Sequence, residues 1–433
     1  MKCFCFYISW LSCLFFLLGA CRPFAEERDA DSLPPIYPDY CNVTIPPNIA
    51  PLNFLMRDDA EQVEVKLKGK KIEYTYISNN GKVQFPQTDW QEMLEREQGA
   101  TIQVTIRALI GNEWVVYRPF KWEITYDTLD AYLLYNSISP DQLSDGGQWR
   151  ERHIETFHER KLPGKYRFKE AKPYFSPGRY IAFATCSPDA GLSISSDDFW
   201  VLYGKNSSLY LFDKTQKELR EVSDSLAGKM TRAYPVLSPD GKWLYYCEAP
   251  SFDPDSLNDW RFSLYRTAFN LRTGRCESPM DTLYEAKAKG HTVTYLSLSP
   301  DGHDLLYTLS SYGMSPDWQQ EADLQRMILP GQEIDSLQVV NSDAFDGQPF
   351  WASDGRWFVF NSKRGDKLYG KPYFCYVDSA GVAHKPFLLP QRDPAWYDYM
   401  LRSMDSPILV TQPVDTGIFA VLEQQLNNEN IKP

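Results

Sequence analysis

The sequence predicts an all-β protein, a β-propeller of five or six blades preceded by a small immunoglobulin-like β-sandwich. A turn of the type Ser-Pro-Asp-Gly recurs four times at near-constant spacing, and the strand after each copy is apolar at almost every position. Before residue 125 the strands instead alternate apolar and polar residues. Repetition predicts stacked units with covered sheets, whereas alternation predicts sheets with one buried face.

The four turn copies carry serines at positions 176, 238, 299 and 353, which lie 62, 61 and 54 residues apart. Proline presets the second position of such a turn and glycine accepts the left-handed conformation at the fourth, so each copy is expected between antiparallel strands. We interpret the aspartates as turn formers rather than as calcium or acid–base groups. The predicted structural residues are Ser176, Pro177, Gly178, Ser238, Pro239, Asp240, Gly241, Ser299, Pro300, Asp301, Gly302, Ser353, Asp354 and Gly355.

The strands after the turns, such as Trp243–Tyr246 and Trp357–Phe360, predict sheets covered on both faces, as propeller blades are by their neighbours. His303 and Asp304 make the third copy more polar, so we expect its sheet to be partly uncovered. A weaker early blade is expected near 131–135, and residues 408–422 are expected to supply a final strand pair that closes the ring. The propeller is assigned to residues 126–425 and a tail to 426–433.

Residues 40–125 are assigned to the β-sandwich. Val63–Leu67 and Ile102–Ile106 alternate strictly, and further strands are expected near 114–116 and 120–122. A short helix is expected around residues 89–98.

The amino terminus predicts export. Residues 1–20 combine one basic residue, Lys2, with a short apolar run, which is typical of a signal peptide. Leu18-Gly19-Ala20-Cys21 resembles the lipobox of bacterial lipoproteins, which implies cleavage before Cys21 and lipid attachment to its sulfur. Residues 21–39 are assigned to a flexible tether. We therefore expect a lipid-anchored outer-membrane protein, on the periplasmic face or the cell surface, that touches the membrane only through its anchor.

Charge and cysteine content argue against nucleic-acid binding and against metal or cofactor sites. Without residues 1–20 the chain has 57 acidic and 44 basic residues, a net charge of −13, which disfavours nucleic acid as a partner. Five cysteines remain beyond Cys21, and none forms a C-x-x-C pair. No metal site and no cofactor is predicted. His153 and His158, with Glu155 and Glu159 nearby, are not expected to bind a metal, because their spacing on a strand or hairpin does not converge on one ion.

The turn followed by an aromatic strand resembles the repeat of TolB-like, WD40-like β-propellers over roughly residues 126–422. The layout is similar to a group of Bacteroidetes lipoproteins with this propeller. Some members carry a C-x-x-C-H haem-attachment motif before the first strong repeat. Residues 162–166 have no such motif, so no cytochrome role is implied.

Catalytic motifs such as G-x-S-x-G, H-E-x-x-H and a phosphate-binding loop are absent from the sequence, and no catalytic residue is predicted. The favoured function is a non-catalytic scaffold that binds an envelope protein or glycan, with residues 250–260 and 311–318 as contact loops. The alternative is a propeller enzyme, a glycoside hydrolase or lyase, with two carboxylates facing each other across the propeller mouth. Six Asp-Ser/Thr-Leu triplets also resemble a Bacteroidetes O-glycosylation sequence, with acceptors at Ser32, Thr128, Ser225, Ser256, Thr282 and Ser336.

Overall fold

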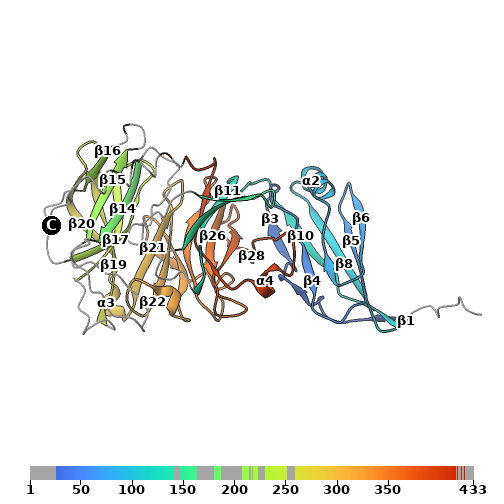
Figure 1. Cartoon of the computed structure of the whole chain (residues 1–433). Helices are drawn as coiled ribbons and strands as arrows, with labels where there is room; N and C mark the ends of the chain where they lie inside the picture. Colours follow the sequence, from blue (N-terminus) through green and yellow to red (C-terminus); the bar gives the residue numbers. More distant parts are fainter. Residues whose placement is uncertain are drawn as a thin grey trace, which may run out of the picture.

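The computed structural model describes residues 26–140, 147–162, 180–186, 207–213, 216, 218–222, 230–250, 259–415, 417, 421 and 424. Several predicted features lie outside these residues: the signal peptide, Cys21, the tail, the turn Ser176–Gly178, and the acceptors Ser225 and Ser256. The described chain is nearly all β and forms two domains that lie side by side (Figure 1).

The first domain consists of two sheets and one helix. The larger sheet contains β1 (Glu26–Asp29), β3 (Val43–Ile45), β5 (Gln62–Lys68), β6 (Glu73–Ser78), β8 (Thr101–Ile110), β9 (Glu113–Val116) and β10 (Phe120–Ile124). The smaller sheet has the order β2 (Ile36–Tyr37), β4 (Phe54–Met56), β7 (Lys82–Val83), and α2 covers Gln87–Arg96. β8 pairs with β5 along one edge and with β9 and β10 along the other.

The predicted alternation is confirmed in this domain, because every second residue is buried along β5 and along most of β8. The predicted helix is also confirmed as α2. Its Trp90 stacks on Phe85 and meets Trp122 of β10 edge to face. Both indole N–H groups donate to backbone carbonyls, of Ile49 and Tyr40 respectively, so these large rings are buried without an unpaired donor.

The predicted flexible tether over residues 21–39 is wrong from Glu26 onward. β1 pairs in parallel with β9, and β2 belongs to the smaller sheet. The charges that made this stretch look solvated form cross-strand ion pairs, Arg28 with Glu113 at 3.0 Å and Glu27 with Arg107 at 2.8 Å. The first domain therefore begins earlier than predicted.

The second domain, called here the repeat domain (residues 131–410), contains five antiparallel sheets among the described residues. The first consists of β11 (Tyr132–Ile138), β12 (Gln148–His153), β13 (Glu159–Lys161) and β29 (Ser403–Val410), and the second of β14 (Tyr180–Cys186), β15 (Ser207–Asp213) and β16 (Glu218–Glu221). The third contains β17 (Met230–Leu237), β18 (Trp243–Pro250), β19 (Ser263–Asn270) and β20 (Arg275–Tyr284), and the fourth β21 (Thr292–Leu298), β22 (Asp304–Ser310), β23 (Asp323–Ile328) and β24 (Glu333–Asp335). The fifth contains β25 (Asp346–Trp351), β26 (Trp357–Ser362), β27 (Lys371–Tyr376) and β28 (Phe387–Leu388). Short helices cover Ala286–Lys289 (α3), Pro316–Trp318 (η4) and Trp396–Tyr399 (α4).

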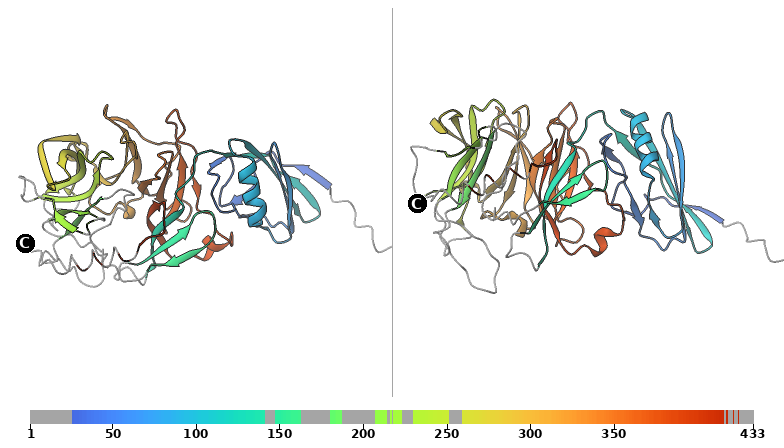
Figure 2. Two further views of the ribbon diagram at one scale, coloured as in Figure 1. Left: turned by 90° about the horizontal axis from the view of Figure 1, so that it is seen from above. Right: turned by 45° about the horizontal axis from the view of Figure 1, so that its top comes forward.

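Successive sheets pack on one another through their first strands, as β17 does on β14 and β15, and β25 on β21 and β22 (Figure 2). Four-stranded antiparallel sheets packed in series are the arrangement of a β-propeller. The predicted two-sided burial is confirmed, since β18 is buried from Leu244 to Ala249 and β26 is buried throughout. The third copy is not partly uncovered as predicted. β25 packs against β22, and residues Leu305–Thr308 are buried.

The repeat turns have the predicted geometry at the second and third copies. Gly241 and Gly302 have φ of 68° and 78°, and their amides donate to the carbonyls of Ser238 and Ser299. Each serine hydroxyl also accepts the amide of the following strand's first residue, as Ser299 does from Asp304 at 2.8 Å. The serine therefore closes the turn from both ends.

The fourth copy is shifted by one residue from the predicted alignment. The amide of Gly355 donates to Ala352 rather than to Ser353, so Ala352 occupies the serine position. Trp357 N instead donates to Asp354 at 3.3 Å. The hydroxyl and amide of Ser353 both donate to the buried carboxylate of Asp130, at the entry to the repeat domain.

Four strands, β17, β21, β25 and β29, share a feature that the sequence did not predict. Tyr234, Tyr295, Gln348 and Ser406 all have positive φ, between 51° and 55°, and each lies at a register shift of its strand pair. Such β-bulges bend a strand and re-aim its backbone groups. Two of the freed amides bond to the preceding sheet, Gln348 N to Thr308 Oγ1 at 3.0 Å and Ser406 N to Gln348 Oε1 at 2.7 Å.

The last strand joins the first sheet. β29 pairs antiparallel with β11 and packs on β25, β26 and β27. The predicted strand pair over residues 408–422 is therefore corrected to one described strand, Ser403–Val410. Its partner is β11, about 270 residues earlier in the chain.

We expect Ser299→Ala to lower the free energy of unfolding by about 1–2 kcal/mol, because it removes the buried hydroxyl that accepts the amide of Asp304. Urea titration followed by tryptophan fluorescence measures this difference. Ser379→Ala, at an exposed position in a hairpin turn, is the matched control. Equal midpoints for the two variants would contradict this role of the serine.

Candidate functional site

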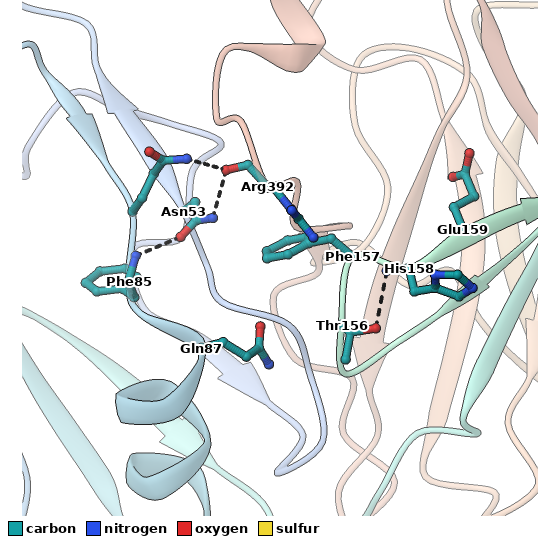
Figure 3. A pocket seen from close by; sticks show the side chains of 9 residues that line it. Asn53, Phe85, Gln87, Thr156, Phe157, His158, Glu159 and Arg392 are labelled. Atoms are coloured by element: carbon teal, nitrogen blue, oxygen red, sulfur yellow. Dashed lines mark hydrogen bonds between the residues drawn. The ribbon is translucent and has the colours of Figure 1, made fainter.

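A cleft of about 640 Å³ lies where the two domains meet (Figure 3). We call it the interdomain cleft. Its lining comes from three segments far apart in the sequence: the first domain, the hairpin between β12 and β13, and the loop after β28. The lining residues are Asn53, Gln84, Phe85, Gln87, Thr156, Phe157, His158, Glu159 and Arg392.

The junction that forms this cleft is extensive. One hydrophobic core runs through both domains, from Val43 and Leu52 to Phe387 and Tyr397. Polar contacts surround it, including the two-pronged ion pair of Arg57 with Asp398 at 2.6 and 2.9 Å. The ion pair is partly exposed and contributes about 1 kcal/mol or less, so the shared apolar core is the main stabilising contact.

Asn53 fixes the relative position of two cleft walls. Its buried amide nitrogen donates to the carbonyls of Gln391 and Arg392, both at 3.1 Å, and its oxygen accepts from Phe85 N at 2.9 Å. Gln84 adds a donor to the same Arg392 carbonyl at 2.7 Å. The backbone of Arg392 is thereby held by the first domain, while its side chain stays exposed.

The hairpin wall presents an aromatic ring and a histidine. Phe157 is half-buried and His158 is exposed. The neighbouring Glu159 is already engaged, because its carboxylate accepts from Arg150 at 2.5 Å and from the Tyr135 hydroxyl. Its structural partners leave Glu159 poorly placed to act as a free acid or base.

Two guanidinium groups lie near the Phe157 ring. The central carbons of Arg152 and Arg392 are each 5.6 Å from the ring centre, within the range of a cation–π contact. Arg152 is only 3% exposed and donates to neutral oxygens, the Gln391 side chain at 2.7 Å and the Pro390 carbonyl. Burial lowers the pKa of this guanidinium.

A second groove of about 690 Å³ lies between the third and fourth repeat turns. Asp301, His303, Asp354 and Arg356 line it, together with the backbone of the hairpin at 379–381. Asp301 and Asp354 accept backbone amides within their own turns. The predicted interpretation of these aspartates as turn formers agrees with those contacts.

Two carboxylates of neighbouring sheets interact electrostatically, that of Asp323 at the start of β23 and that of Asp346 at the start of β25. Burial, with the nearby charges of Asp346 and Glu321, raises the pKa of Asp323 to about 6. Asp346 is completely buried, and it accepts from Arg364 and from the Ser342 hydroxyl, both at 2.6 Å. Asp346 is therefore a structural ion-pair partner, and Asp323 is the only member of the pair with an accessible carboxyl.

The other predicted contact features are placed as follows. Of the loop 311–318, Trp318 is 53% exposed, whereas residues 251–258 of the other loop lie outside the described part. His153 contacts Thr156 at 3.3 Å, and His158 opens into the cleft. The described acceptors Ser32, Thr128, Thr282 and Ser336 are all exposed.

Within the described ranges, no group of three or more His, Cys, Asp or Glu side chains is arranged to hold a metal ion. Cys41, Cys247 and Cys375 are buried free thiols. No helix in the same ranges has the length and apolar character needed to span a membrane.

Sequence reasoning missed most of the cleft. Asn53, Gln84 and Arg392 belong to no motif, and only the tertiary fold brings them to the hairpin. The one available signal was the hairpin itself, where Phe157 stands in an otherwise polar run between Glu155 and Glu159.

No protein-family model matches the sequence, and no curated protein is similar to it. Solved structures that are similar at low identity include the following three. TolB from Acinetobacter baumannii is 10% identical over 75% of this chain and 85% of its own, with a TM-score of 0.39. An oligogalacturonate lyase in complex with manganese is 13% identical over 76% and 85%, with a TM-score of 0.33. A DUF4784 family protein from Bacteroides caccae is 10% identical over 82% and 84%, with a TM-score of 0.27. All three TM-scores are below 0.5.

We expect Asp323→Asn to raise the melting temperature at pH 7.5 and to have a smaller effect at pH 5. The raised pKa means that the aspartate's protonation stabilises the folded state at low pH, and that this stabilisation is lost as the pH rises through about 6. Asparagine cannot ionise, so it avoids the loss. Thermal unfolding at both pH values measures the effect, with Asp29→Asn on the exposed strand β1 as control. An equal difference in melting temperature between Asp323→Asn and the wild type at both pH values would contradict the raised pKa of Asp323.

Proposed function

We propose that this chain is a non-catalytic, lipid-anchored protein of the bacterial cell envelope that binds a glycan in its interdomain cleft. The observation that carries the proposal is the state of the cleft's polar groups. Among the described residues, the side chains of His158 and Arg392 make no hydrogen bond or ion pair, whereas Glu159 is fully engaged. The cleft therefore offers two polar side chains, His158 and Arg392, that are available to hold a polar ligand.

The chemistry of the lining favours a sugar over an apolar ligand. Phe157 offers a ring face, and the amide side chains of Gln84 and Gln87 supply groups that can bond to hydroxyls. Binding sites generally combine such a ring with a few fixed polar groups. An envelope protein that presents a polar loop at the same cleft is the alternative partner.

We further infer that the repeat domain is a five-bladed propeller closed by β29, and that the first domain is an immunoglobulin-like sandwich. The order β2-β4-β7 facing a sheet built on β5 and β8, with a parallel strand beside β10, supports the second inference. The sandwich would then act as a rigid spacer between anchor and propeller. An experimental structure with a further sheet between β13 and β14 would overturn the blade number.

A propeller enzyme remains the second candidate, and one observation favours it. The raised pKa of Asp323 is a property of general acids. Release of new reducing ends from envelope polysaccharide by the native chain, and its loss in Asp323→Asn, would establish catalysis. No release from either would leave Asp323 as a structural residue.

We expect Phe157→Ala to lower glycan affinity at least tenfold, because it removes the ring face while leaving the Asn53 contacts intact. The test is a glycan microarray probed with the full lipid-bearing chain in detergent. Tyr126→Ala removes an exposed aromatic ring that does not line the cleft, and it should bind like the wild type. Unchanged binding by Phe157→Ala would place the ligand elsewhere.

We expect the native protein to begin at Cys21 with acyl chains on its sulfur, and Cys21→Ser to be released from membranes. Intact-mass spectrometry of envelope-purified protein measures the lipid, and membrane fractionation measures its loss. The same spectra test glycosylation at the six predicted acceptors. In Asp127-Thr128-Leu129 and in Asp335-Ser336-Leu337 the acceptor is exposed and the leucine is buried, which leaves the hydroxyl accessible. An unmodified mass would exclude both modifications.

A further inference from the structure

The interdomain cleft lacks the acidic excess of the chain as a whole, because its lining has one acidic side chain, Glu159, and one arginine, Arg392. The chain has a formal net charge of −12. In the cleft wall, the one acidic side chain, Glu159, is paired with Arg150. Among the described residues, Arg392 has no carboxylate partner, and the adjacent Asp393 is paired with Lys82 at 3.2 Å. Glu155 does not line the cleft, and its carboxylate accepts from Gln91 at 3.4 Å.

A second cation lies behind the cleft wall. Arg152 is buried without a carboxylate in ion-pair contact among the described residues, and its Nε has no hydrogen-bond partner. A buried charge is normally paired, because removing it from water is costly. Interactions with a buried charge are also weakly screened by salt. Arg152 therefore adds positive potential near the Phe157 ring, 5.6 Å from the ring centre.

We propose that the interdomain cleft selects carboxylate-bearing saccharides, such as uronate-containing glycans, with Arg392 receiving the carboxylate while the sugar lies against Phe157. This inference rests on the proposed function and specifies its ligand class. A guanidinium presents two parallel N–H donors that match a carboxylate, and that contact is stronger than one between neutral groups. His158 is the second exposed donor at the same cleft, and Gln87 can bond to hydroxyl groups.

The experiment uses pairs of oligosaccharides that differ only in charge. Hexamers of hyaluronan, alginate and polygalacturonate are printed beside their carboxyl-reduced forms and probed with the full chain. We expect at least one acidic hexamer to bind tenfold or more tightly than its reduced form. That preference should shrink between 50 mM and 500 mM salt, because exposed charges are screened.

Two arginine variants locate the effect. Arg392→Gln should abolish the preference for the acidic member, and the loop should keep its place because the Arg392 carbonyl still accepts from Asn53 and Gln84. Arg118→Gln makes the same charge change at an exposed position outside the cleft, and it should keep the preference. Arg392→Lys should retain part of the preference for the acidic member, because it keeps the positive charge.

Each outcome separates the inference from the proposed function. Equal binding of both members, lost in Phe157→Ala, would overturn the acidic selection and leave the glycan-binding function intact. Binding of neither member of any pair would overturn the selection, and the wider microarray would then decide the function. Equal loss in Arg392→Gln and Arg118→Gln would mean that overall charge, not the cleft, attracts the ligand.

Discussion

The pairing of β29 with β11 is the constraint on which the rest of the molecule depends. It returns the end of the chain to the first sheet of the repeat domain and places β29 against β25 and β26. The segment that leads into β29, residues 389–402, is thereby held against the first domain. Because Arg392 lies in that segment, the same pairing that joins the two ends of the repeat domain also builds one wall of the interdomain cleft.

Order among the sheets depends on polar contacts as well as on apolar packing. The bulged residues of β25 and β29 direct their amides toward the neighbouring sheet, so that Gln348 N donates to Thr308 and Ser406 N donates to Gln348. Such contacts require one register, since a slip would leave buried amides unpaired. Apolar strands such as β26 supply the stabilisation, and the bulges decide which sheet face meets which neighbour.

Among the three turns that the structure describes, the repeat is least regular where the two domains meet. In the fourth turn Ala352 replaces the serine of the other copies, and Ser353 bonds to Asp130 instead. The indole of Trp357 and the hydroxyl of Tyr376 bond to Asp127 nearby. A turn that closes on itself elsewhere is here used to attach the repeat domain to the segment that enters it. Departure from the motif therefore marks an interface rather than a degenerate copy.

The sequence by itself determined the features that depend on neighbouring residues. Pro239 and Gly241 predict their turn, the alternation of Val63–Leu67 predicts a half-buried strand, and the apolar run at Trp357 predicts a covered one. Tertiary structure alone decided the partners. Glu26–Asp29 looks like a solvated tether until Glu113 and Arg107 are opposite it, and Asn53 is an ordinary amide until Arg392 lies beside it. The reason is physical: turn and strand preferences act over a few residues, whereas a cleft needs side chains that are brought together only when distant segments bury a common core.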